Sequence, residues 1–150
     1  MRVVIQRVSR AAVRIEDEVV GQIDRGFMIL LGIETADGPA DVEWLVRKIA
    51  SLRIFADGEG KMNESLLDIQ GEVLIVSQFT LHAKTKKGAR PSFIHAAHPD
   101  HAIPLYEGFI REMERVIQRP VATGRFGADM SIELVNDGPV TLLIDSQNKE

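Results

Sequence analysis

The sequence of 150 residues contains no cysteine. This absence excludes thiolate nucleophiles, disulfide bonds and cysteine-ligated metal centres. Because a fold without disulfides suits a reducing compartment, we expect a cytoplasmic protein. The sequence also lacks a run of about 20 apolar residues, the length that a membrane-spanning helix needs. The first residues show neither the apolar core nor the cleavage site of a signal peptide, so we expect no membrane association and no targeting segment.

Positive charge is also scarce. The chain has 18 lysines and arginines against 22 aspartates and glutamates, for a formal net charge of -4. Binding to nucleic acid therefore cannot depend on a globally positive field and needs a local basic patch. One such concentration lies in a segment with the loop-forming residues Gly88 and Pro91, and it consists of Lys84, Lys86, Lys87 and Arg90. On charge alone, this loop is either an RNA contact or a solvated surface loop.

The hydrophobic content of 45% is typical of a chain that folds as one compact domain, here residues 1–150. Val3 to Ile15 show the alternation of antiparallel strands, with a turn at 16–18 and a return strand at 19–23. Residues 26–33 form a nearly unbroken apolar run, which predicts a central strand covered on both faces. Later strands are expected at 72–79, 131–135 and 140–144, with the last two joined by a turn at 136–139.

Two segments show the spacing of helices that pack on a core. In the first, the apolar stripe consists of Val42, Leu45, Ile49 and Leu52. In the second, Pro104 lies near the start or introduces a kink, and the stripe consists of Ile103, Tyr106, Ile110, Met113 and Ile117. Many strands with only two principal helices indicate an α+β fold with a mainly antiparallel, curled, barrel-like sheet.

Polar side chains follow the apolar strand at 72–79 as it ends. A rigid scaffold aims Ser77, Gln78 and Thr80 outward, which makes them candidates for a site. The ordinary alternative is that serine and threonine satisfy backbone groups at the end of a strand. Gly138 and Pro139 are a second unusual pair, because proline cannot donate in a sheet and the pair is typical of a tight turn. An X-Pro bond prefers trans by only about 0.5–1 kcal/mol, so a cis bond that turns two carbonyl groups to one side is accessible.

Histidines occur in one stretch of the chain and raise two alternatives. His95, His98 and His101 have a spacing that could serve a zinc site, although Pro99 interrupts the stretch and a three-residue spacing drifts around a helix. Thr80 and His82 would share a face of a strand, as a nucleophile and its base.

Four motifs occur in order along the chain: SQFTL at 77–81, RPSF at 90–93, TGRFGADM at 123–130 and NDGPVT at 136–141. QRV at 6–8 accompanies them. Together they resemble the D-aminoacyl-tRNA deacylase family, also called the D-tyrosyl-tRNA deacylase family, and the resemblance spans essentially the whole chain.

The resemblance implies hydrolysis of the ester bond of D-aminoacyl-tRNA, and also of glycyl-tRNA mischarged on tRNA-Ala. It implies that L-aminoacyl-tRNA is rejected by a Gly-cisPro filter at Gly138 and Pro139. It further implies a homodimer with composite active sites, in which the Gly-Pro unit of one subunit reaches into the pocket of the other, and no metal or organic cofactor.

The resemblance also implies roles for individual residues. Gln78, Phe79 and Thr80 are the expected catalytic residues, with Phe79 and Thr80 offering main-chain N–H groups to the oxyanion. The expected substrate-binding residues are Ser77, Met130, Gly138, Pro139 and Arg7. Arg7 would brace the Gly-Pro loop, and Met130 would line the pocket wall. The positive charge of the basic loop, in an otherwise acidic chain, makes Lys84, Lys86, Lys87 and Arg90 the expected tRNA-binding residues.

Three alternatives remain open from the sequence. Thr80 as a covalent nucleophile is a second mechanism for the same reaction. A non-catalytic RNA-binding module would use the basic loop without turnover, and a metal-dependent hydrolase would use the histidines.

Overall fold

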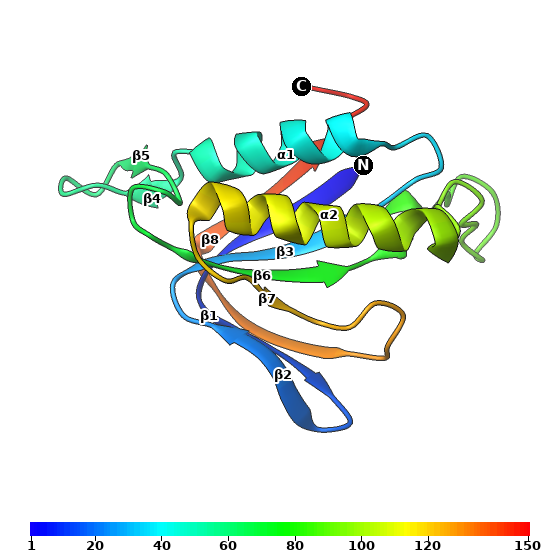
Figure 1. Cartoon of the computed structure of the whole chain (residues 1–150), viewed down its shortest axis with the longest axis horizontal. Coiled ribbons are helices and arrows are strands. Elements are labelled where there is room, and N and C mark those ends of the chain that lie inside the picture. Colours follow the sequence, from blue (N-terminus) through cyan, green and yellow to red (C-terminus); the bar gives the residue numbers. More distant parts are fainter.

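A curled sheet with two helices on one face forms the molecule, as seen in a computed structural model that describes residues 1–150 (Figure 1). The strands are β1 (Arg2–Ile15), β2 (Glu18–Ile23), β3 (Gly26–Gly32), β4 (Phe55–Ala56), β5 (Met62–Glu64), β6 (Glu72–Ser77), β7 (Ala122–Thr123) and β8 (Ser131–Asp145). The helices are α1 (Pro39–Ser51), the 3-10 helix η1 (Phe79–His82) and α2 (Pro99–Ile117). Pro104 lies inside α2. None of these helices combines the length and the apolar character needed to cross a membrane.

The long strand β1 is the axis of the sheet. Ile23 of β2 lies opposite Ala11, and Gly26 of β3 lies opposite Val8, so β2 and β3 follow each other along one edge of β1. The other edge of β1 pairs with β8 from Arg2 to Arg14. The predicted alternation and return strand are confirmed, and the turn between β1 and β2 places Glu16 and Asp17 at positive φ.

The central strand β3 joins the antiparallel and parallel parts of the sheet. It pairs antiparallel with β1 and parallel with β6, and β6 pairs parallel with β7. The connections between these parallel strands run through α1 and α2, because parallel neighbours need a long crossover. At the far side, a Cβ added to Gly21 of β2 would lie 2.8 Å from the carbonyl oxygen of Thr123 in β7, so the sheet is nearly closed. The predicted α+β, barrel-like fold is confirmed, with a sheet that is mixed.

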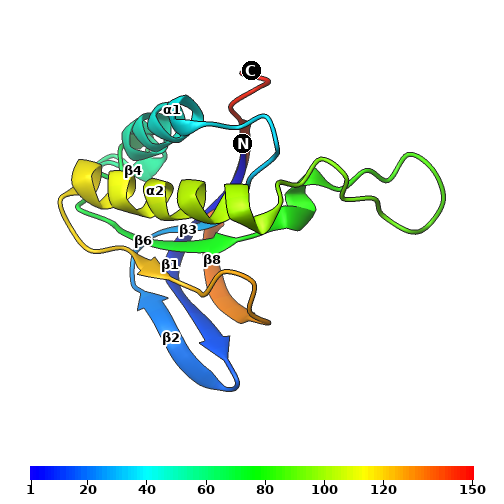
Figure 2. The same ribbon diagram turned by 45° about the vertical axis from the view of Figure 1, so that its right-hand side comes forward.

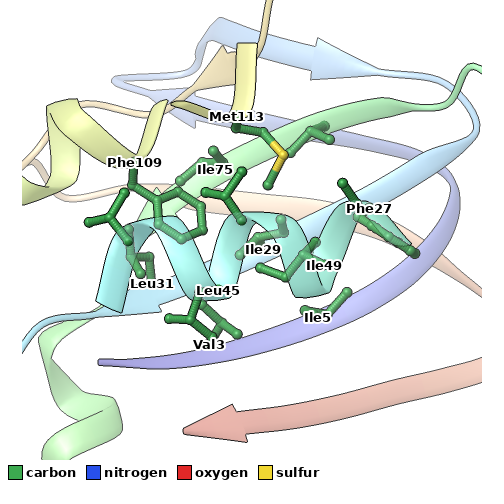
Figure 3. Packing of buried hydrophobic residues seen from close by; sticks show 14 of the residues in the cluster. Val3, Ile5, Phe27, Ile29, Leu31, Leu45, Ile49, Ile75, Phe109 and Met113 are labelled. Atoms are coloured by element: carbon green, nitrogen blue, oxygen red, sulfur yellow. The ribbon is translucent and has the colours of Figure 1, made fainter. Parts of the chain in front are cut away.

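The main core lies between the sheet and the two helices. Figure 3 shows Leu45 of α1 and Phe109 of α2 over Ile29 of β3, with Ile75 of β6 beside them. A smaller cluster on the opposite face of the sheet includes Met28, so apolar side chains cover β3 on both faces, as predicted.

Two of the predicted strand boundaries are wrong. The strand predicted at 72–79 ends at Ser77, and Phe79 begins η1. The two strands predicted at 131–135 and 140–144 are one strand, β8, and no turn reverses the chain between them. Both halves run in the same direction along β1, because β1 is long enough to pair with each of them.

The residues between the two halves of β8 form a bulge. Gln6 of β1 pairs with Thr141, and Val8 pairs with Asn136. The register shifts between these pairs, so Asp137–Val140 lie opposite the single residue Arg7. A bulge of this kind interrupts a strand without reversing it. The Gly-Pro pair therefore projects from the side of a strand.

We predict that Gly26→Ala lowers the free energy of unfolding by at least about 3 kcal/mol or prevents folding, because an added side chain must displace neighbouring backbone. A Cβ at Gly26 would collide with the backbone carbonyl of Glu72 in the parallel partner strand. The matched control is Gly58→Ala, where a Cβ meets no atom within 4 Å. Urea denaturation followed by circular dichroism measures both, and equal stability of the two variants would contradict this view of the β3–β6 contact.

Candidate active site

A pocket of about 290 Å³ opens at the carboxyl ends of the parallel strands β3 and β6. Four of the predicted site residues line it: Ser77, Gln78, Phe79 and Met130. The remaining wall comes from the ends of the two strands, the start of α2 and the residue Ala97 before it, and the segment that leads into the first residues of β8: Leu31, Ile33, Val76, Ala97, Ala102, Phe126, Gly127, Ala128, Asp129 and Ile132. The pocket is mostly apolar, and Asp129, which is exposed, is the one lining residue with an ionisable side chain.

The end of β6 determines how the polar residues face the pocket. Gln78 donates its backbone N–H to the carbonyl of Leu31 at 2.8 Å, which is the last contact of this strand with β3. Phe79 and Thr80 then begin η1. The first N–H groups of a helix have no acceptor within the helix, because no helical turn precedes them. The Phe79 ring is 55% exposed and stands edge-on against Phe93, with ring centroids 5.0 Å apart.

Thr80 contacts Gln78 and not His82. The Gln78 side chain donates from Nε2 to the Thr80 hydroxyl at 2.5 Å. His82 is 3% exposed, and its Nε2 has no hydrogen-bond partner. The predicted pairing of Thr80 with His82 assumed a strand, in which alternate residues share a face. It is wrong because the two residues lie in a 3-10 helix, whose three residues per turn separate positions i and i+2.

The other three histidines do not come together. The His101 ring lies 2.9 Å from the backbone carbonyl of Asp37, and Nδ1 of His98 lies 3.5 Å from the Asp100 carboxylate. No group of three or more histidine, aspartate or glutamate side chains in the chain has the arrangement to hold a metal ion. The zinc hypothesis therefore has no geometric support.

Met130 and Phe126 come from the segment that precedes β8. A Cβ added to Gly124 would overlap the Met130 sulfur, so the missing side chain at Gly124 makes room for this part of the wall. Phe126 packs against Tyr106 of α2, with ring centroids 5.7 Å apart. Burial raises the pKa of Tyr106, and its hydroxyl has no hydrogen-bond partner. Sequence reasoning missed Tyr106 as a neighbour of the site, because its spacing is that of an ordinary core position.

Arg7, Gly138 and Pro139 lie outside this pocket. Arg7 donates from Nε to the backbone carbonyl of Asp137 at 3.0 Å, and its Nη1 donates to the carbonyl of Ile54. Its guanidinium also lies 3.4 Å from the Asp137 carboxylate. The bond between Gly138 and Pro139 is cis, as predicted, and residues 137–139 are exposed.

The bulge and the pocket are far apart within one chain. Arg7, which holds the bulge, pairs with Phe27 at the start of β3, whereas the pocket lies beyond Leu31 at its end. Four residues of strand correspond to about 13 Å. Strand β8 itself reaches the pocket only at its start, where Ile132 lines it, and the bulge lies further along the strand. One chain therefore does not bring Gly138 and Pro139 to its own pocket.

The basic loop begins directly after η1. Lys84 and Ser92 exchange two backbone hydrogen bonds of 2.8 and 3.0 Å, which close the loop between them. Figure 2 shows this segment projecting from the body of the molecule. All four predicted side chains, Lys84, Lys86, Lys87 and Arg90, are exposed.

The family model described as D-Tyr-tRNA(Tyr) deacylase matches residues 4–145. The chain belongs to this family. The resemblance inferred from the motifs is thus confirmed, and the chain is a hydrolase of the deacylase class.

Relatives align along the whole chain. The D-aminoacyl-tRNA deacylase of Cytophaga hutchinsonii is 59% identical and that of Bacteroides thetaiotaomicron is 54% identical, with full coverage of both chains in each case. A solved structure described as the c-Myc DNA unwinding element binding protein superposes with a TM-score of 0.90 at 39% identity, covering 97% of this chain and 98% of that one. A probable eukaryotic D-amino acid tRNA deacylase superposes with a TM-score of 0.82 at 20% identity, covering 95% and 97%, and this likeness concerns the fold.

We predict that Gly124→Ala raises KM of the deacylase several-fold while the protein remains folded, because the added methyl group displaces Met130 into the pocket. The matched control is Gly108→Ala in α2, where the nearest atom to an added Cβ is 3.9 Å away and alanine favours the helix. Steady-state kinetics with both variants measures the effect. An unchanged KM in folded Gly124→Ala would show that Met130 does not shape the binding pocket.

Proposed function

We propose that this deacylase hydrolyses the ester bond between a D-amino acid and the 3′-terminal adenosine of tRNA, releasing the free amino acid and the tRNA. Glycyl-tRNA mischarged on tRNA-Ala is a second substrate, and correctly charged L-aminoacyl-tRNA is rejected. Because aminoacyl-tRNA is made and used in the cytoplasm, this activity places the enzyme there.

The observation that carries the mechanism is that no buried ionisable side chain, and so no buried general acid or base, lines the pocket. The lining is apolar apart from Ser77, Gln78 and the exposed Asp129. An aminoacyl ester is already activated, so the enzyme needs chiefly to position the carbonyl, admit water and stabilise the oxyanion. The first N–H groups of η1, at Phe79 and Thr80, are donors suited to that purpose, and they stand next to the pocket.

The side chains of Ser77 and Gln78 shape the place of the ester and the adenosine. Gln78 is held in position, because its amide nitrogen donates to the Thr80 hydroxyl and its backbone N–H donates to Leu31. In this role Thr80 orients Gln78 and offers its own N–H. The 2′-hydroxyl of the terminal ribose lies beside the ester and assists the attack of water.

A homodimer would complete the site. Within one chain the bulge with Gly138 and Pro139 is exposed, and neither residue lines the chain's own pocket. In the composite arrangement that the family resemblance implies, the bulge of one subunit enters the pocket of the other. Arg7 keeps the bulge in shape through its bonds to the carbonyls of Asp137 and Ile54.

The bulge acts as the chirality filter. Its exposed carbonyl groups accept hydrogen bonds from the ammonium group of the substrate and so fix the α-carbon. Gly138 cannot carry a side chain without collision, because a Cβ would lie 2.9 Å from Nη2 of Arg7 and from Cγ2 of Val140. An L side chain would point into this wall, whereas a D side chain points away. Steric exclusion discriminates more strongly than one apolar contact, which is worth about 1–3 kcal/mol.

Incubation of the unmodified protein with D-Tyr-tRNA and L-Tyr-tRNA, each with and without EDTA, tests this function. We expect rapid hydrolysis of the D-ester alone and no effect of the chelator. A protein that binds both tRNAs without turnover would be an RNA-binding module, and activity lost with EDTA would identify a metal-dependent hydrolase. Equal hydrolysis of both esters would refute the filter.

We predict that Thr80→Ala retains substantial deacylase activity, within about tenfold of the unmodified enzyme, because the main-chain N–H groups survive the substitution. Thr85→Ala, another exposed threonine, is the matched control for the assay. A folded Thr80→Ala variant at the uncatalysed rate, or an acyl-threonine trapped and detected by mass spectrometry, would establish the covalent mechanism instead.

We predict that replacing Lys86 and Lys87 with alanine flattens the dependence of tRNA affinity on salt. Each phosphate contact contributes about 0.7–0.9 to the slope of log K against log salt, so the slope should fall by about one to two. Lys61→Ala is the control, because this exposed lysine is paired with Glu59 outside the loop. Filter binding over a salt series measures the slopes, and an unchanged slope would mean that the loop is only solvated surface.

A further inference from the structure

A second cleft, of about 420 Å³, opens at the C-terminal end of η1. Its lining residues are Arg2, Glu34, His82, Ala83, Lys84 and His95. None of them lines the active-site pocket, which begins with Ser77, Gln78 and Phe79 at the other end of the same short helix. Four of these six side chains carry nitrogen atoms that donate hydrogen bonds. The cleft therefore has the composition of an anion site beside the place of reaction.

The donors come from separate parts of the chain, and one of them is held rigidly. Arg2 at the start of β1 donates from Nε to Asp145 at 2.7 Å and from Nη1 to the carbonyl of Leu81 at 3.1 Å. These two bonds fix the guanidinium and leave Nη2 free. Lys84 and His95 form no ion pair and no side-chain hydrogen bond within the chain, so their donors are free for a ligand.

One acidic side chain, Glu34, lies among these donors. Its carboxylate is 4.0 Å from the amino group of Met1, which is paired more closely with Asp37. Arg2, which also pairs with Asp145 outside the lining, and Lys84 are the two positive side chains of the cleft against this one carboxylate. The lining itself therefore has one positive charge in excess, which suits a singly charged anion.

His82 supplies an independent observation. Its side chain is more than nine-tenths buried and lines the cleft, and its Nε2 has no hydrogen-bond partner within the chain. Buried polar side chains in folded proteins almost always have a partner. A ligand in the cleft would meet an imidazole whose hydrogen-bonding capacity is unused.

We propose that this cleft binds a phosphodiester group of the tRNA acceptor end, just before the terminal adenosine. The proposal rests on the proposed function, because it names a further contact for the same substrate. Arginine, lysine and histidine are the side chains that position phosphate groups in complexes with nucleic acids. Along the chain, the cleft residues His82 and Ala83 come after the pocket residues Ser77 to Phe79 and directly before the basic loop, which begins at Lys84. A strand whose last nucleotide enters the pocket would pass the cleft before it reaches the loop.

The kinetic test uses His95→Glu, with His98→Glu as a matched control. Both histidines are exposed and three positions apart, but only His95 lines the cleft. We expect His95→Glu to raise KM for D-Tyr-tRNA about tenfold at low salt with kcat unchanged, because a carboxylate repels the phosphate. His98→Glu should change KM less than about twofold, because its side chain lies outside the cleft and its charge is screened by solvent.

The second substrate in this test is D-tyrosyl-adenosine, an ester without a phosphate group. Its hydrolysis should be the same in the unmodified enzyme and in both variants. If His95→Glu slows both substrates equally, or neither, the cleft does not bind a tRNA phosphate. If the unmodified enzyme hydrolyses neither substrate, the deacylase function itself fails, so the two failures are distinguishable.

Direct binding separates the possible sources of the phosphate. In an NMR titration, the trinucleotide CCA should shift the ring signals of His82 and His95 at lower concentrations than inorganic phosphate does. Shifts by inorganic phosphate alone would identify a site for a free anion and overturn the proposal. Unshifted ring signals with both ligands would overturn it as well.

Discussion

The pairing of β1 with β8 along nearly the full length of both strands is the constraint on which the rest of the structure depends. It holds the two halves of β8 in line and leaves Asp137–Val140 as a bulge opposite Arg7. Because Arg7 also pairs with Phe27 at the start of β3, the same register separates the bulge from the pocket at the end of β3. A substrate that needs both features has to meet them on two copies of the chain.

The pocket itself is a product of the parallel half of the sheet. Strands β3 and β6 end at the same edge, and η1 turns the chain there so that backbone N–H groups stand beside an apolar cavity. An ester needs no buried base in such a place, because stabilisation of the oxyanion and exclusion of competing orientations supply most of the rate. The chemistry that we propose for the deacylase thus depends on the backbone more than on a reactive side chain.

Local patterns in the sequence were sufficient for helices α1 and α2, the return strand β2 and the buried strand β3, and they singled out Ser77 to Phe79, which line a pocket. These patterns failed where the structure depends on which distant strand a segment pairs with. The alternation in 131–144 cannot reveal that both halves of β8 pair with β1, and apolar residues in 72–79 do not mark where η1 begins. The same limit applies to the site. The motifs assign both Gly138 and Met130 to substrate binding, but the register of long-range strand pairs keeps the two residues apart within one chain.

Complementation between defective subunits tests the composite site most directly. One variant, Ser77→Trp, fills the pocket, and the other, Gly138→Trp, obstructs the bulge; each should be inactive alone. In a heterodimer one of the two sites receives a normal pocket and a normal bulge, so an equal mixture of the refolded variants should recover about a quarter of the normal activity. A mixture that contains heterodimers by native mass spectrometry and stays as inactive as its parents would contradict the account.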